Sequence, residues 1–107
     1  MSLQRLNKLR ALMETHRIDV IALIPGPNLR YLTGGVHYVL ERPILWFLLL
    51  DGQPVAVIPK LETPLFLRHR MPATLYSWTD KEGFDSAFET ALAALDFSGK
   101  TIGVERL

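Results

Sequence analysis

The 107-residue sequence contains no cysteine. This absence excludes disulfide bonds, thiolate catalysis and cysteine-based zinc or iron–sulfur sites within the chain, and it fits a reducing, cytoplasmic location. An excess of charge of one sign is also missing, since 12 basic and 11 acidic residues leave a net charge of +1. A chain so close to neutrality has no strong field to attract nucleic acid or a membrane surface, so we expect neither as a partner.

Long hydrophobic runs are missing as well. The longest, Ile44 to Leu50, has seven residues, far fewer than the roughly 20 that span a bilayer. The N-terminus interleaves apolar with polar residues and lacks the profile of a signal peptide. Apolar residues nevertheless make up 49% of the chain, which is enough to build one core in a chain of single-domain size.

Two stretches show the three- and four-residue spacing of an amphipathic helix. The apolar stripe of the first is Leu3, Leu6, Leu9, Leu12 and Met13, and that of the second is Phe84, Ala87, Phe88, Ala91, Leu92 and Leu95. Thr79 and Glu82 match a capping box for the second helix, although Gly83 would weaken its first turn. Shorter helices are expected over 28–32 and, opened by Thr63-Pro64, as far as His69.

Strands are predicted at 20–24, 44–50, 55–58, 74–78 and 101–105. The first three are short apolar runs, and residues 74–78 alternate like a strand. Asp51-Gly52 separates the second run from the third and favours a tight turn, which predicts an antiparallel hairpin. The order of elements indicates an α/β fold, with a mixed β-sheet that contains this hairpin and is flanked by helices. We expect five side chains to be largely buried: Leu23, Leu48, Val57, Phe88 and Leu92.

Residues for chemistry are sparse. His16, His37 and His69 lie far apart, and none has a neighbour at the spacing of a metal-ligand pair. The nucleophile motif Gly-x-Ser-x-Gly and the glycine-rich phosphate loops are missing. We therefore expect no catalytic residue and no metal ligand set in this chain.

One segment, TGGVHYVLER at 33–42, carries polar and aromatic side chains between two predicted buried strands. Its candidates for recognition are His37, Tyr38, Glu41 and Arg42, because binding residues often lie on loops held by a rigid scaffold. The alternative is a solvated connection with an ordinary Glu–Arg pair.

Several short motifs, in their order and spacing, resemble the N-terminal domain of the creatinase/prolidase/aminopeptidase P family. They are Ile18-Asp19-Val20, the run from Asn28 through Tyr31, Leu32 and Thr33 to Gly34, Ile58-Pro59-Lys60-Leu61-Glu62, and Ile102-Gly103-Val104-Glu105. The resemblance covers the whole chain, so residues 1–107 are expected to form one such domain, with a ribonuclease H-like fold.

The resemblance implies a catalytic C-terminal domain that is absent from this chain. In the peptidase members that domain binds two divalent metal ions, such as Mn, Co or Zn. The resemblance also implies a homodimer through the N-terminal domain, and a loop that covers the active site of the partner subunit. On that basis His37, Tyr38 and Arg42 are the substrate-capping residues. The remaining motif residues Asn28, Tyr31 and Gly34 are expected to be structural, with the ring of Tyr31 buried.

Three functions remain open on these grounds. The chain can be the dimerising, substrate-capping domain of an Xaa-Pro dipeptidase or aminopeptidase. It can be the same domain of a metal-free creatinase-like or other non-peptidase hydrolase. It can also be a stand-alone interaction module. The sequence ends directly behind a predicted strand, from which we expect more protein to follow.

Overall fold

The computed structural model describes residues 3–24, 26–33, 44–63 and 73–104. Its helices and strands follow one another along the chain as α1 (Leu3–Thr15), β1 (Val20–Leu23), α2 (Pro27–Thr33), β2 (Leu45–Leu49), β3 (Val55–Pro59), the 3-10 helix η1 (Lys60–Glu62), β4 (Thr74–Trp78), α4 (Phe84–Leu95) and β5 (Ile102–Val104). Most of the predicted helix from Thr63-Pro64 to His69 lies outside the described residues. None of the described helices is long and apolar enough to cross a membrane.

The five strands form one mixed sheet in the order β4-β3-β2-β1-β5. β2 runs antiparallel to both its neighbours, whereas β1 pairs parallel with β5 and β3 parallel with β4. The predicted hairpin is confirmed, since Leu45 pairs with Val57 and Phe47 with Val55 across the turn. Gly52 in that turn has a φ of 110°, which glycine adopts without steric cost.

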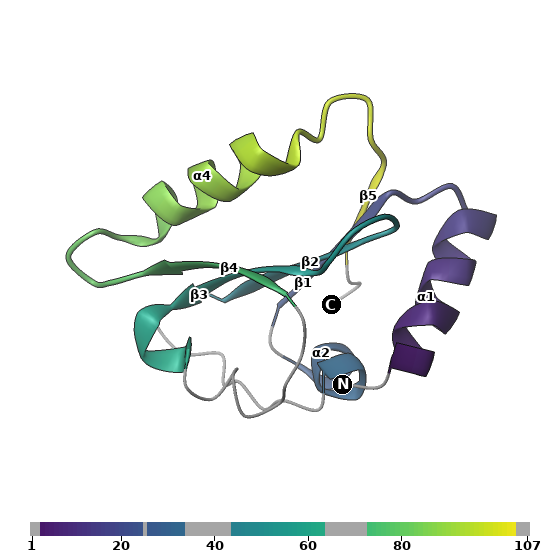
Figure 1. Cartoon of the computed structure of the whole chain (residues 1–107), viewed down its shortest axis with the longest axis horizontal. Coiled ribbons are helices and arrows are strands. Elements are labelled where there is room, and N and C mark those ends of the chain that lie inside the picture. The colour runs from purple at the N-terminus through teal and green to yellow at the C-terminus, as the bar shows by residue number, and fades with distance from the viewer. Residues whose placement is uncertain (1–2, 25, 34–43, 64–72, 105–107) are drawn as a thin grey trace.

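Helices cover both faces of the sheet, with α1 and α2 on one side and α4 on the other (Figure 1). Because strand side chains alternate between faces, the strands β1 to β4 contribute to two cores. The core under α1 and α2 contains Leu6, Leu23, Leu29, Leu32, Ile44, Trp46, Leu48, Ala56 and Ile58. The core under α4 contains Val20, Phe47, Val55, Val57, Trp78 and Ala91. The α/β fold with a mixed sheet is therefore as predicted.

Helix α1 is attached to the sheet by a few strong contacts. Leu6 and Met13 are buried. The Arg10 guanidinium reaches across to the hairpin, where Nε donates to the Leu49 carbonyl at 3.1 Å and Nη2 donates to the Gly52 carbonyl. Leu12 belongs to the apolar stripe of this helix, yet it is 59% exposed.

Helix α4 begins later than its capping signal suggests. The Thr79 hydroxyl accepts from the Glu82 N–H at 3.3 Å and donates to the Glu82 carboxylate at 3.0 Å. These bonds close an isolated turn, and Gly83, with φ 84° and ψ 157°, then redirects the chain into the helix. Phe88 and Leu92 pack against the second core but are only partly buried, in contrast to the fully buried Ala91 of the same helix. Leu23, Leu48 and Val57 are buried as predicted.

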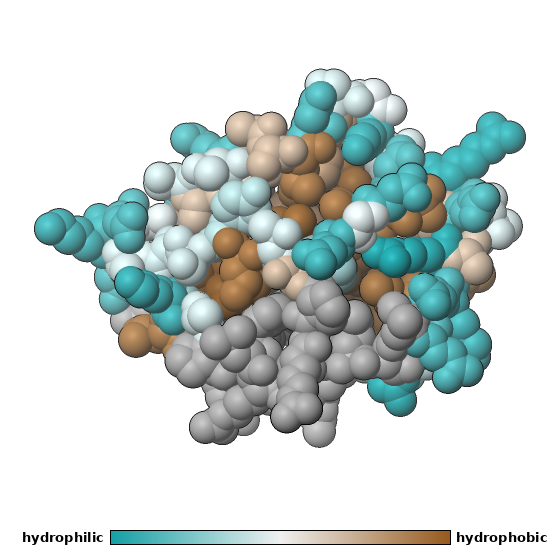
Figure 2. All heavy atoms as spheres, in the orientation of Figure 1, coloured by the Kyte–Doolittle hydropathy of each residue, from teal (hydrophilic) through white to brown (hydrophobic). Residues whose placement is uncertain are grey.

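The surface carries no continuous apolar face in the view of Figure 2. Hydrophobic atoms reach the surface in separate patches between hydrophilic ones. On the right of that view, where α1 lies, hydrophobic atoms are visible between long polar side chains. Sites on such a surface have to be located from individual contacts.

Candidate functional site

Helix α2 carries the motif that the sequence singled out, and its position is fixed by two leucines. Leu29 and Leu32 are buried in the core under α1 and α2. Pro27 is the first residue of the helix. Proline suits this position because a backbone N–H there would have no partner within the helix. The helix is therefore packed in place and ends at Thr33, the first residue of the segment 33–42 that the sequence singled out.

The capping residues themselves, His37, Tyr38 and Arg42, lie outside the described residues, as does the motif glycine Gly34. Of the predicted segment 33–42 the structure describes only Thr33, the last residue of α2. The next described residue is Ile44, a buried core residue directly before β2.

Tyr31 differs from its prediction. Its ring is not buried: 57% of the residue is exposed. The Arg5 guanidinium of α1 lies over the ring at 4.3 Å from its centroid, and Arg5 Nη1 also donates to the Tyr31 carbonyl at 2.7 Å. A cation on an aromatic face is stabilising by about 0.5–1 kcal/mol at exposed sites. Tyr31 therefore links α2 to α1 through its surface and does not act as a core residue.

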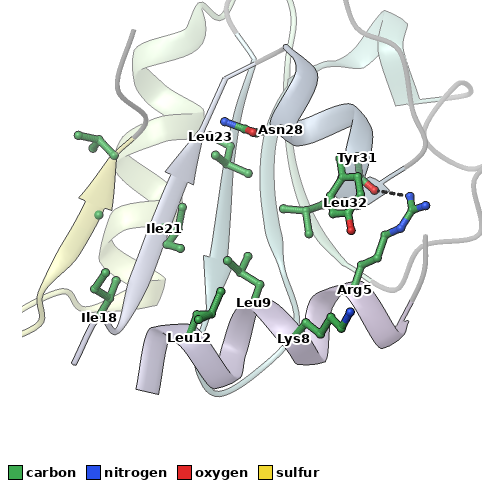
Figure 3. Close-up of a pocket in the computed structure, with 12 residues that line it drawn as sticks. Arg5, Lys8, Leu9, Leu12, Ile18, Ile21, Leu23, Asn28, Tyr31 and Leu32 are labelled. Carbon is green, nitrogen blue, oxygen red and sulfur yellow. Dashed lines mark hydrogen bonds between the residues drawn. The ribbon is translucent and has the colours of Figure 1, made fainter. Parts of the chain in front are cut away.

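Between α1, β1, α2 and β5 lies a hollow of about 470 Å³, which we call the α1–β5 groove (Figure 3). Most of its lining is apolar and comes from Leu9 and Leu12 of α1, Ile21 and Leu23 of β1, and Leu32 of α2. Arg5, Lys8, Asn28 and Tyr31 supply its polar margin, and Gly103 and Val104 of β5 form the opposite side. Asn28 and Tyr31, two of the motif residues, thus meet at one site.

Asp19 of the Ile-Asp-Val motif joins β1 to β5. Its carboxylate accepts from the Thr101 N–H at 2.8 Å, and its own N–H donates to the Thr101 carbonyl at 2.9 Å. Its carbonyl accepts from the Leu50 N–H at 2.9 Å. Asp19 therefore fixes the start of the parallel pair β1–β5 and also joins β1 to the end of β2. This motif position has a structural role.

The chemical capacity of the described residues is for binding. No three His, Cys, Asp or Glu side chains of these residues come together in a way that could hold a metal ion. His16 is exposed just after α1, whereas His37 and His69 lie outside the described part. What the described residues offer is an apolar groove with a cationic margin, a chemistry that suits an amphipathic anionic partner.

The sequence matches the creatinase/prolidase N-terminal domain over residues 5–107. The chain belongs to this family. A search of curated proteins gives no match.

Solved structures agree with this assignment. A proline dipeptidase from Streptococcus pneumoniae is 28% identical with a TM-score of 0.79, over 98% of this chain and 74% of that one. A dipeptidase from Pyrococcus horikoshii is 29% identical with a TM-score of 0.77, over 94% of this chain and only 28% of that one. A creatinase-type domain of a dipeptidase from Streptococcus thermophilus, 18% identical with a TM-score of 0.76, covers all of this chain and shows the shared fold. This chain thus resembles the N-terminal domains of Xaa-Pro dipeptidases.

Proposed function

We propose that this creatinase/prolidase N-terminal domain is the non-catalytic domain of an Xaa-Pro dipeptidase-like enzyme, where it contributes to the homodimer and covers the active site of the partner subunit. The observation that carries the proposal is the likeness to the proline dipeptidase of Streptococcus pneumoniae across almost the whole chain. The dimer and the covering role rest on the resemblance to the family.

The described residues on either side of the segment 33–42 support the covering role. Leu32 before it and Ile44 after it are both buried in the same core, so both flanks are fixed by packing. Binding residues often lie on segments attached to such a scaffold. Arg42 offers a planar fork that suits a substrate carboxylate, and Tyr38 offers a flat apolar face that suits a proline ring.

The proposal assigns the two divalent metal ions, Mn, Co or Zn, to a separate catalytic domain. The described residues contain no cluster of ligands that fits such a pair. The 107-residue chain on its own is therefore expected to hydrolyse no Xaa-Pro dipeptide when Mn²⁺, Co²⁺ or Zn²⁺ is added. This is checked by product release from a sample free of host peptidases.

A chimera tests the covering role. The chain replaces the matching N-terminal part of the prolidase from Thermococcus sibiricus, of which it covers 35%. We expect the chimera to hydrolyse Xaa-Pro dipeptides. Tyr38→Ala and Arg42→Ala should each lower kcat/KM roughly tenfold or more, since small losses of substrate positioning are costly. Lys60→Ala, at an exposed position of η1, is the matched control.

Thermal unfolding separates function from folding in this experiment. If the two loop variants keep the melting temperature of the chimera and lose activity, the covering role holds. If both variants keep full activity in a folded chimera, the loop has no such role. A folded chimera that is inactive while the parent prolidase is active would favour the stand-alone interaction module.

A further inference from the structure

Strand β4 and helix α4 enclose a second hollow, of about 290 Å³, which we call the β4–α4 groove. It has no part in the proposed function. We propose that this groove binds an extended, basic peptide segment of another protein, which adds to the sheet as a strand beside β4. The inference is independent of the covering role of the segment 33–42, because the groove lining includes none of its residues.

The groove is bounded by the edge of the sheet and by one side of α4, which passes over the sheet (Figure 1). Its strand side is β4 from Leu75 to Trp78, and its helix side is formed by Gly83, Ser86, Ala87 and Thr90. These four residues follow one another at spacings of one, three and four, so they share one side of the helix. All four are small, which leaves room between α4 and β4 that larger side chains would fill.

The distance between β4 and α4 is fixed by packing. The ring of Trp78, at the end of β4, lies edge-to-face against the ring of Phe84, with 6.1 Å between their centroids. Trp78 is only 6% exposed, and Ala91 on the next turns of α4 is fully buried. Aromatic pairs of this kind stabilise the contact between the elements that carry them. The groove is therefore formed before a partner binds.

The backbone of β4 has hydrogen-bonding groups that point out of the sheet. β4 is the last of the described strands on its side, and the Thr74 N–H donates to the Pro54 carbonyl at 2.9 Å on the inner side. Successive residues of a strand direct their backbone groups to opposite sides. Leu75 and Ser77 therefore each direct an N–H and a C=O away from β3. An added strand pairs with groups of this kind.

β4 lacks the features that protect an edge strand from pairing. Protected edge strands are usually very short, or they carry proline, lysine or a bulge. β4 has five residues, Thr74–Trp78, and none of them is charged or a proline. The edge strand on the opposite side, β5, has only three residues, one of which is Gly103. Of the two described edges, β4 is thus the one that suits an added strand.

The charge of the groove selects a basic peptide. Glu82 is the only charged residue among the described residues that line it, and its carboxylate accepts from the Thr79 hydroxyl at 3.0 Å. Glu89 is exposed and follows Ser86 by three positions, so it projects on the same side of α4. Two copies of the chain paired along β4 would bring these carboxylates together, and such like-charge contacts are unfavourable.

An added strand would place every second side chain on the α4 face of the sheet. A lysine or arginine at these positions can lay its apolar stem along the small residues of α4 and bring its charge to Glu82 and Glu89. Alternation of basic and uncharged residues is therefore the pattern that the groove should recognise.

Titration with designed peptides tests the inference. The probe is a fluorescein-labelled peptide of about seven residues that alternates lysine and valine, long enough to span the five residues of β4. We expect it to bind the 107-residue protein, as measured by fluorescence anisotropy. The same peptide with glutamate in place of lysine should bind roughly tenfold or more weakly. Methylation of the backbone nitrogens of the lysine–valine peptide should abolish binding, because it removes the donors that pair with β4.

Amide hydrogen exchange locates the bound peptide. The Leu75 and Ser77 amides should gain protection when the lysine–valine peptide binds. The Tyr76 amide lies between them and faces β3, so its exchange should change little. This alternation is expected of a strand added to the edge, whereas a peptide bound to α4 alone would leave all three amides unchanged.

Two substitutions test the groove and its charge. Ser86→Trp fills the groove from an exposed position of α4 and should weaken binding roughly tenfold or more through a steric clash. Ser98→Trp is the matched control, because Ser98 is exposed and lies outside the groove lining, and it should leave the affinity unchanged. Glu82→Lys should weaken binding of the lysine–valine peptide and strengthen binding of the glutamate–valine peptide.

Four results would overturn the inference. They are a lysine–valine peptide that does not bind, a Ser86→Trp protein that binds it as tightly as the parent, and protection on binding at amides other than Leu75 and Ser77. The fourth is a dimer in sedimentation that Ser86→Trp dissociates and the peptide does not, since the occupant of the groove is then a second copy of the chain.

Discussion

Replacing Asp19 by alanine should loosen the contact between β1 and β5. The Asp19 carboxylate accepts the Thr101 N–H at 2.8 Å, beside the backbone bond from the Asp19 N–H to the Thr101 carbonyl. Alanine removes the first bond and leaves the second. Asp19→Asn keeps an acceptor oxygen of similar reach but loses the charge, so it isolates the electrostatic part of the effect.

The magnitude follows from the kind of bond. A hydrogen bond to a charged group contributes about 1.5–3 kcal/mol to stability, and the solvent exposure of this one places it at the lower end of that range. We therefore expect Asp19→Ala to lower the free energy of unfolding by about 1–2 kcal/mol and Asp19→Asn by roughly half as much. Urea unfolding measures this as a lower midpoint with an unchanged m-value.

Local and global effects can be told apart by amide hydrogen exchange. The Thr101 amide should lose protection in Asp19→Ala by more than the amides of β3, because β5 is held at the sheet edge by few bonds. Glu89→Ala on the exposed side of α4 is the matched control and should change neither measurement. An Asp19→Ala protein with the parent midpoint and unchanged exchange at Thr101 would refute the reasoning.

Four further substitutions test the packing and the backbone. Leu48→Ala, at a fully buried position under α1 and α2, should destabilise the protein by about 2–5 kcal/mol. Phe88→Ala should cost less than the about 3–5 kcal/mol of a fully buried phenylalanine because Phe88 is only partly buried; a loss within that range in urea unfolding would contradict its position at the margin of the second core. Gly83→Ala should cost about 1–3 kcal/mol because its φ of 84° and ψ of 157° suit glycine alone. Gly26→Ala is the control, because a Cβ at Gly83 or at Gly26 would meet nothing within 4 Å and, of these two glycines, only Gly83 has a positive φ. If Gly26→Ala and Gly83→Ala unfold at the same urea midpoint, the backbone conformation of Gly83 does not explain the loss.

Local signals predicted the local structure well. The Asp-Gly turn and the apolar periodicity gave the hairpin and both long helices, because turn chemistry and helix amphipathicity are properties of neighbouring residues. The order of the sheet was not predictable in this way. β5 joins β1 from the far end of the chain, and the Asp19–Thr101 bonds that fix this pairing join residues that no short-range pattern connects.

The partial burial at α4 and the exposure of Tyr31 have a common physical origin. Periodicity shows which side of a helix is apolar, yet it does not show how far the partner layer extends over that side. Phe88 and Leu92 therefore match a core stripe and still lie at its margin. Tyr31 satisfied the motif but meets Arg5 on the surface, a contact between segments that lie 26 residues apart. The capping residues His37, Tyr38 and Arg42 remain a prediction.

The motif positions acquire a common explanation once the fold is known. Asp19 fixes the register between β1 and β5, Gly103 keeps the face of β5 low, and Tyr31 holds Arg5 at the edge of the same groove. These residues come from three separate parts of the sequence, and each joins elements that are distant along the chain. The Asp19 carboxylate ties β1 to the start of β5, and Tyr31 ties α2 to α1 through Arg5. Contacts between such distant segments stabilise the fold, which gives these motif positions a structural role.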